Sequence, residues 1–95
     1  MKDFDARFAA LKEQFENNQA TFVLTELETS TAFCERALAS SDADTVERNK
    51  RNACKGYETA LKFWNNSELD LGDIPEFRDK LDHLKSLLHQ LGQNV

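Results

Sequence analysis

Glycine and proline are scarce in this sequence: its 95 residues include three glycines and a single proline, Pro75. An all-β sandwich changes chain direction about every ten residues and needs turn-forming residues at each change, so this scarcity excludes that fold class. Collagen-like and low-complexity chains are excluded as well. The hydrophobic fraction of 40% and the charged fraction of 31% are typical of a soluble globular or coiled-coil-like domain.

Cysteines and long apolar runs are also lacking. Two cysteines, Cys34 and Cys54, are too few for the disulfide framework of a small secreted domain. The first residues do not resemble a secretory signal, and no stretch approaches the roughly 18–20 consecutive apolar residues that span a membrane. We therefore expect a cytoplasmic protein of bacterial type without a membrane partner. Both cysteines are predicted to be core-packed thiols, because free cysteine is among the most buried residue types.

The length predicts one helical-bundle domain over residues 1–95, because chains divide into separate cores only well above this size. The formal net charge of -5 disfavours nucleic acid or an anionic membrane as the main partner. Charge is unevenly spread, since residues 41–65 carry a slight excess of basic groups and the rest of the chain is acidic. Segments of opposite charge suggest neighbouring helices that complement each other, or a partner that contacts the basic segment.

Apolar residues recur with helical spacing in four segments, and no segment shows the alternation of a strand. The first stripe is spaced 4-3-4 and consists of Phe4, Phe8, Leu11 and Phe15. Asn17, Asn18 and Gln19 follow it and favour caps and turns, so this helix is expected to end near Asn17. A second helix is predicted from about Ala20 to Ala39. Its stripe consists of Ala20, Leu24, Leu27, Thr31, Cys34 and Leu38, with Phe22, Val23, Phe33 and Ala37 beside it.

A turn is predicted at residues 40–44, where serines and aspartates offer several N-caps for a third helix from roughly Asp44 to Asn65. Gly56 lies within that helix, and the small residues around it favour close approach of a neighbouring helix. Asp73 is the predicted N-cap of a fourth helix, with Pro75 in its first turn, and Gly92 is its predicted C-cap. The expected inner faces consist of Val46, Ala53, Tyr57, Ala60 and Trp64 in the third helix and of Ile74, Phe77, Leu81, Leu84, Leu88 and Leu91 in the fourth.

These segments predict an all-α fold, an up-down-up-down antiparallel four-helix bundle. The helices over residues 20–39 and 44–65 are expected to form a long central hairpin that the other two cover. The alternative is a helical hairpin that completes its core only as a homodimer. That alternative is prompted by the large aromatic surface of a chain with seven phenylalanines and one tryptophan.

No arrangement of residues indicates catalysis or metal binding. The acidic residues lie off the apolar stripes, where they lack the perturbed pKa that acid–base chemistry needs. His83 and His89 are about 120° out of alignment on a helix and cannot chelate together. Asp79 and His83, four residues apart, form a two-ligand edge at most and are more typical of a surface ion pair. We therefore predict no catalytic residue, no metal and no cofactor.

One short basic strip, consisting of Arg48, Arg51 and Lys55 on one side of the third predicted helix, is the candidate partner-binding site. Surface charge runs mostly form solvated, ion-paired faces, which is the interpretation favoured here. The sequence thus predicts a non-catalytic protein–protein interaction or self-association module, a homodimer being possible. The alternative is an accessory nucleic-acid-binding protein that uses the basic strip.

Overall fold

The computed structural model describes residues 2–66 and 71–95 and, for residues 2–17, the helix backbone alone. This part of the chain forms three α-helices and one short 3-10 helix, and it contains no strand: α1 (Lys2–Ala39), α2 (Ala43–Asn66), η1 (Leu71–Asp73) and α3 (Pro75–Gln90). The predicted all-α class is confirmed. The predicted four-helix bundle in up-down-up-down order is wrong, because three helices are present where four were expected.

The difference lies in α1, which joins the two helices expected over residues 4–17 and 20–39 into one. Residues 17–19 do not interrupt it. An ordinary residue such as asparagine costs at most about 0.7 kcal/mol in a helix relative to alanine, whereas proline costs about 3 kcal/mol. The sequence holds neither glycine nor proline before Gly56, so nothing in this stretch forces the helix to end.

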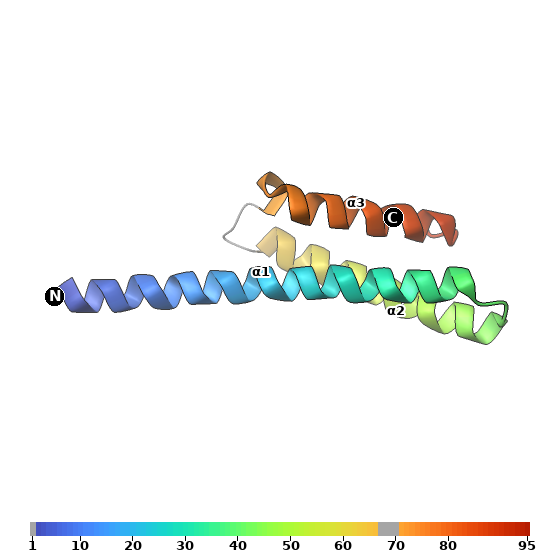
Figure 1. The fold of residues 1–95 in the computed structure, drawn as a ribbon, viewed down its shortest axis with the longest axis horizontal. Coiled ribbons are helices and arrows are strands. Elements are labelled where there is room, and N and C mark those ends of the chain that lie inside the picture. The colour runs from blue at the N-terminus through green and yellow to red at the C-terminus, as the bar shows by residue number, and fades with distance from the viewer. Residues whose placement is uncertain (1, 67–70) are drawn as a thin grey trace.

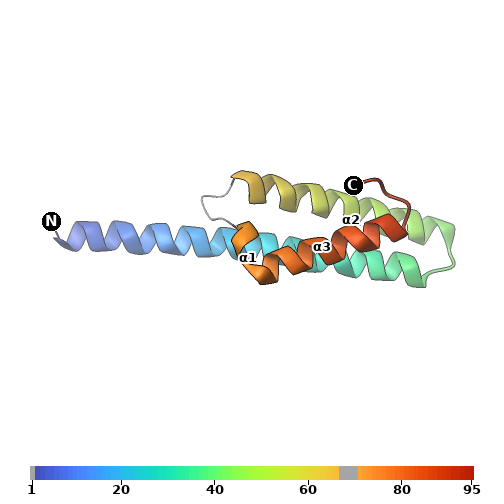
Figure 2. The ribbon, with the colours of Figure 1, turned by 90° about the horizontal axis from the view of Figure 1, so that it is seen from above.

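The three helices run alternately along one axis, with α2 and α3 both lying beside α1 (Figure 1). The molecule measures 62 × 22 × 17 Å. At 1.5 Å per residue, the 38 residues of α1 are about 57 Å long, so this helix alone sets the long dimension. Its amino-terminal part extends beyond the ends of α2 and α3 in both ribbon views (Figures 1 and 2).

The core lies where α2 and α3 cover the carboxyl-terminal half of α1. The buried line of α1 is spaced 4-3-4-3 and consists of Val23, Leu27, Ser30, Cys34 and Ala37. Opposite it lie Ala53, Tyr57 and Ala60 of α2, Phe77, Leu84, Leu87 and Leu88 of α3, and Leu71 of η1. The predicted stripe of α1 is therefore confirmed at Leu27 and Cys34 and wrong at Leu38, which is 42% exposed.

Ser30 occupies the core because α1 and α2 approach closely at Gly56. A Cβ atom added to Gly56 would lie 1.8 Å from Ser30 Oγ and 3.2 Å from Ser30 Cβ. A methyl group would require the Ser30 hydroxyl to rotate away and Ser30 Cβ to shift by a few tenths of an ångström, so the contact favours a small residue on each helix. The predicted role of Gly56 in close helix packing is confirmed.

Replacing Gly56 by alanine tests this contact. Helix propensity alone would stabilise the Gly56→Ala variant by about 1 kcal/mol. We expect instead a net destabilisation of about 1–3 kcal/mol, because the added methyl overlaps Ser30. Urea unfolding measures the difference. The double variant Ser30→Ala/Gly56→Ala should recover part of the loss, and a more stable Gly56→Ala single variant would contradict the contact.

The predicted turn before α2 is confirmed and places the N-cap at Asp42. Its carboxylate accepts hydrogen bonds from the Thr45 backbone N–H at 3.1 Å and from the Thr45 hydroxyl at 2.6 Å. These bonds favour the charged form and lower the pKa of Asp42. The Asp42 carbonyl accepts the first helical bond, from Val46 N–H. The helix begins at Ala43, one residue before the predicted start.

Each of the two predicted caps of α3 lies one residue from the observed cap. The N-cap is Ile74 rather than Asp73, which belongs to η1, while Pro75 takes the first helical position as expected. The buried side chain of Leu71 anchors η1 against the core, and this places the turn one residue later than the cap pattern suggests. At the other end, Leu91 is the C-cap and Gly92 follows it with φ +84°. The N–H groups of Gly92 and Gln93 donate to the carbonyls of His89 and Leu88, so the predicted glycine at the end of this helix is confirmed one residue beyond the cap.

Candidate interaction surfaces

The basic strip lies on the exposed side of α2. Arg48, Arg51 and Lys55 are all solvent-exposed. In the described part of the chain, none of these three side chains forms an ion pair with an acid. Lys50 is the strip's neighbour that does so, to Glu47 at 3.6 Å. The expected solvation of the strip is therefore observed. Within the described residues the expected neutralisation is limited to the Lys50 ion pair and a longer-range interaction of Arg48 with Asp42.

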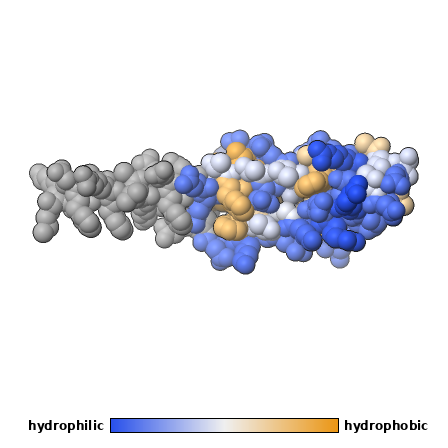
Figure 3. Space-filling model, turned by 90° about the horizontal axis from the view of Figure 1, so that it is seen from below, coloured by the Kyte–Doolittle hydropathy of each residue, from blue (hydrophilic) through white to orange (hydrophobic). Residues whose placement is uncertain are grey.

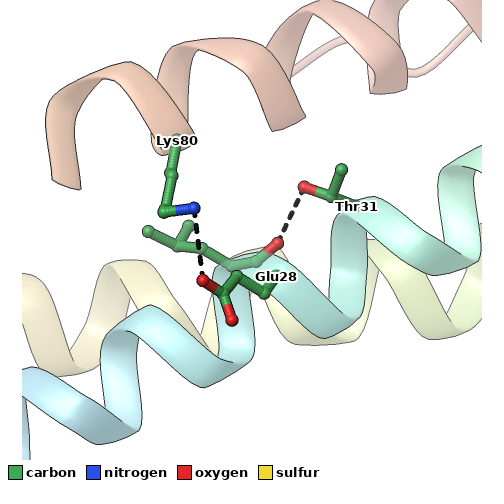
Figure 4. A network of polar contacts seen from close by, with 4 residues as sticks. Glu28, Thr31 and Lys80 are labelled. Atoms are coloured by element: carbon green, nitrogen blue, oxygen red, sulfur yellow. Dashed lines mark hydrogen bonds and ion pairs between the residues drawn. The ribbon is translucent and has the colours of Figure 1, made fainter. Parts of the chain in front are cut away.

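A second surface feature is a groove of about 340 Å³ between α1 and α3. It is lined by Leu27, Glu28, Thr31, Asp79, Lys80 and His83. Lys80 of α3 and Glu28 of α1 form an ion pair at 3.2 Å across it, as Figure 4 shows. Beside this pair, the Thr31 hydroxyl donates a hydrogen bond of 2.8 Å to the Leu27 carbonyl. The groove therefore has a charged rim over a narrow apolar floor.

Asp79 and His83, the two-ligand edge considered from the sequence, both line this groove. Glu28 on the opposite wall adds a third titratable side chain, but its carboxylate is paired with Lys80. Over residues 18–66 and 71–95, no three His, Cys, Asp or Glu side chains are grouped so as to hold a metal ion. The partly exposed ion pair adds one contact between α3 and α1 at the groove, and α3 is held to the bundle mainly by its buried core residues.

A third surface feature is apolar and lies where α2 ends beside α1. Phe22 of α1 and Phe63 of α2 are 38% and 39% exposed, and their ring centroids are 4.5 Å apart. A hollow of about 120 Å³ adjoins them, lined by Gln19, Lys62, Phe63 and Asn66. Gln19 Oε1 is buried and accepts no hydrogen bond within the described residues. We call Gln19, Phe22 and Phe63, with this hollow, the aromatic step.

The sequence patterns did not single out the aromatic step. The patterns place Phe22 beside a buried stripe, where exposure cannot be inferred, and they do not include Phe63 in the expected inner face of its helix. One signal was available: Phe22 follows Phe15 by seven residues and so belongs to the register of the first stripe. Figure 3 shows an apolar area toward the amino-terminal end of the described surface, on a face that is otherwise mostly hydrophilic.

The threonine row of α1 faces solvent, since Thr21, Thr25 and Thr29 are all exposed. None of the three helps to hold α1 in the bundle through burial. The packing that holds the helix comes from the opposite, buried line, and the row gives α1 an uncharged polar surface between the aromatic step and the turn to α2.

The cysteines are core-packed, as predicted. Cys34 is completely buried, and Cys54 is half-buried against the same core. Burial raises the pKa of the Cys34 thiol to about 11, and nearby Cys54 and Glu35 add to the effect. Burial also raises the pKa of Cys54, to which Glu58 contributes. Both thiols are free and protonated at neutral pH.

Thiol labelling tests this difference in burial. A shift from the ordinary value of 9.0 to about 11 reduces the thiolate fraction of Cys34 about 100-fold near pH 8. We expect an aromatic disulfide reagent to label Cys54 first and Cys34 only at the rate of unfolding. Because the folded-state pKa is raised, stability contributed by Cys34 is present below pH 9 and is lost as pH rises from 9 toward 11. Equal labelling rates in Cys34→Ser and Cys54→Ser variants would contradict this assignment.

Over residues 18–66 and 71–95, each helix is too short or too polar to cross a membrane. Comparisons of the chain with protein-family models, with curated proteins and with solved structures gave no match.

Proposed function

We propose that the protein is a non-catalytic helical interaction module that binds a helix of a protein partner at the aromatic step. The observation that carries this proposal is the contact between the tilted rings of Phe22 and Phe63, two large apolar side chains left exposed side by side. Large aromatic side chains are enriched at the centres of protein interfaces, because each removes much apolar surface from water when covered.

The shape of the aromatic step favours a helix as the bound element. At this place α2 ends at Asn66, while α1 continues toward its amino terminus (Figure 2). A partner helix can therefore lie against α1 end to end with α2. An amphipathic helix presents apolar side chains at positions i, i+3, i+4 and i+7, a pattern that fits such a shallow surface.

Gln19 supplies a polar contact at the same place. Its Oε1 atom is buried beside the hollow without a donor. A buried acceptor without a partner costs about 1–3 kcal/mol. Rotation of the Gln19 amide toward the hollow that it lines would let a bound side chain donate to Oε1 and remove that cost. The aromatic step thus combines apolar area with one unsatisfied acceptor, the mixture that gives an interface both affinity and a preferred orientation.

Selection from a displayed library of helical peptides tests the proposal. We expect the wild-type protein to select peptides with apolar anchors at helical spacing. The Phe22→Ser/Phe63→Ser variant should bind them at least tenfold more weakly, because the apolar area of both rings is removed. Fluorescence anisotropy of labelled peptides measures the affinities.

Leu38→Ser is the matched control, because Leu38 is equally exposed but lies at the opposite end of α1. It should bind the selected peptides as wild type does. Circular dichroism melts should show both variants folded. Failure to select any helical peptide, or equal binding by the Phe22→Ser/Phe63→Ser variant, would contradict the proposed function.

The exposed, unpaired side chains of Arg48, Arg51 and Lys55 favour accessory nucleic-acid binding as a second candidate function. Free cations on one helix side are the residues that contact phosphates. Against this, the net charge of -5 repels polyanions, and Glu47 and Glu58 interrupt the strip.

A salt titration distinguishes the two candidates. We expect no DNA or RNA binding at micromolar protein in 50 mM salt by fluorescence anisotropy. Replacing Arg48, Arg51 and Lys55 together by alanine should alter stability by at most about 1 kcal/mol, because none of them is ion-paired. A complex that weakens with salt and is lost in the triple variant would favour the nucleic-acid function instead.

A further inference from the structure

The amino-terminal half of α1 is a helix without a neighbour in the described chain. Residues 2–17 extend beyond α2 and α3 in both ribbon views (Figures 1 and 2). The last residue of α2, Asn66, lines the same hollow as Gln19, so α2 ends before it can accompany this segment. Helices of about 15 residues are marginal alone in water, and most helical stability in proteins comes from packing an apolar face.

The sequence places an apolar face on this segment. Phe4, Phe8, Leu11 and Phe15 share one side of the helix by their 4-3-4 spacing. That side is in register with Phe22, because seven residues from Phe15 to Phe22 return to within about 20° of the same direction. Leu27, on the buried line, is about 120° away from Phe15.

Phe22 connects this face to an interface that already exists. The centroid of its ring lies 4.5 Å from that of Phe63 of α2, so α2 packs along this side of α1. The stripe of residues 4–15 therefore continues the α1–α2 interface past the end of α2. The missing element is a second helix in line with α2.

We infer that a second copy of this chain supplies that helix, with residues 2–17 of the two α1 helices packed antiparallel about a two-fold axis. The inference goes beyond the proposed function, because the second copy packs on residues 4–15 and leaves the aromatic step uncovered. The 4-3-4 spacing is the same in both chain directions. One antiparallel register therefore places each of the four stripe residues level with a stripe residue of the other copy, in four layers. Phe4 of each copy is level with Phe15 of the other, and Phe8 with Leu11, as an isologous interface requires.

Charge selects the antiparallel orientation. With the stripe at the core positions of a helix pair, Asp5 and Lys12 occupy one flank and Arg7 the other. Antiparallel packing places Asp5 of each copy beside Lys12 of the other, two attractive pairs. Parallel packing would place Arg7 beside Lys12, two repulsive pairs.

The size of the interface is sufficient for a weak dimer. Two stripes contribute six phenylalanines and two leucines. Since a buried aromatic side chain removes about 150–250 Å² from water, the pair buries on the order of 1,000 Å². That is about the minimum area for a biological protein–protein interface and is typical of weak association. In each chain the residues of this segment project beyond the ends of α2 and α3 (Figure 1), so antiparallel pairing places the two bundles at opposite ends of the paired segment.

Sedimentation equilibrium of the full chain tests the inference. We expect a monomer–dimer equilibrium in the micromolar range for wild type. Phe8→Glu should weaken dimerisation at least 100-fold, because it places a charge in the central layer. Ala6→Glu adds the same charge on the opposite side of the helix and should leave the equilibrium within about threefold of wild type.

A charge exchange tests the orientation. Lys12→Glu should weaken the antiparallel dimer about tenfold by placing acid beside Asp5, and Asp5→Lys/Lys12→Glu should restore it. Tighter association of Lys12→Glu would instead indicate the parallel arrangement and overturn the inference. A monomer at every concentration would overturn it too. The proposed function would then still stand if helical peptides bind at the aromatic step, so the two failures are distinguishable.

Discussion

The contact between Ser30 and Gly56 determines how the rest of this molecule is arranged. Two helices that cross at a glycine approach more closely than side chains of ordinary size would permit. That approach fixes the rotation of α1 about its own axis, and with it the line of residues that faces the core. Because the axis of α1 is straight over its length in the ribbon, the same contact also fixes the direction of its amino-terminal half (Figure 1).

The fold illustrates which features a sequence pattern specifies. The start of α2 was predictable because Asp42 caps it with a side chain, and its small inner residues were predictable from Gly56. The end of α3 was predictable because Gly92 provides a positive φ that other residues avoid. In each case few residue types satisfy a local requirement for a cap, a small side chain or a positive φ. The residue type alone therefore indicates the local structure.

The errors come from features that residue type does not specify. Asn17 and its neighbours favour caps, but a cap preference of a few tenths of a kcal/mol ends a helix only where another conformation is better. Likewise, the apolar stripe of α1 was assigned one position away from the buried line at Thr31. Ser30 is polar and was not expected in the core, since its burial depends on the glycine opposite, 26 residues later. Tertiary contacts therefore decide both points.

Because α1 is one unbroken helix, a rotation of the helix at the Ser30 contact displaces its amino-terminal end. From Ser30 to Phe4 is a span of about 40 Å at 1.5 Å per residue. A change of 5° in the crossing angle of α1 and α2 moves that distant end by about 3 Å, comparable to the difference between a tight contact and a lost one. Small changes of side-chain packing in the core therefore produce larger displacements at the amino-terminal end of α1. The Ser30–Gly56 contact limits these displacements, because it restricts the crossing angle of α1 and α2.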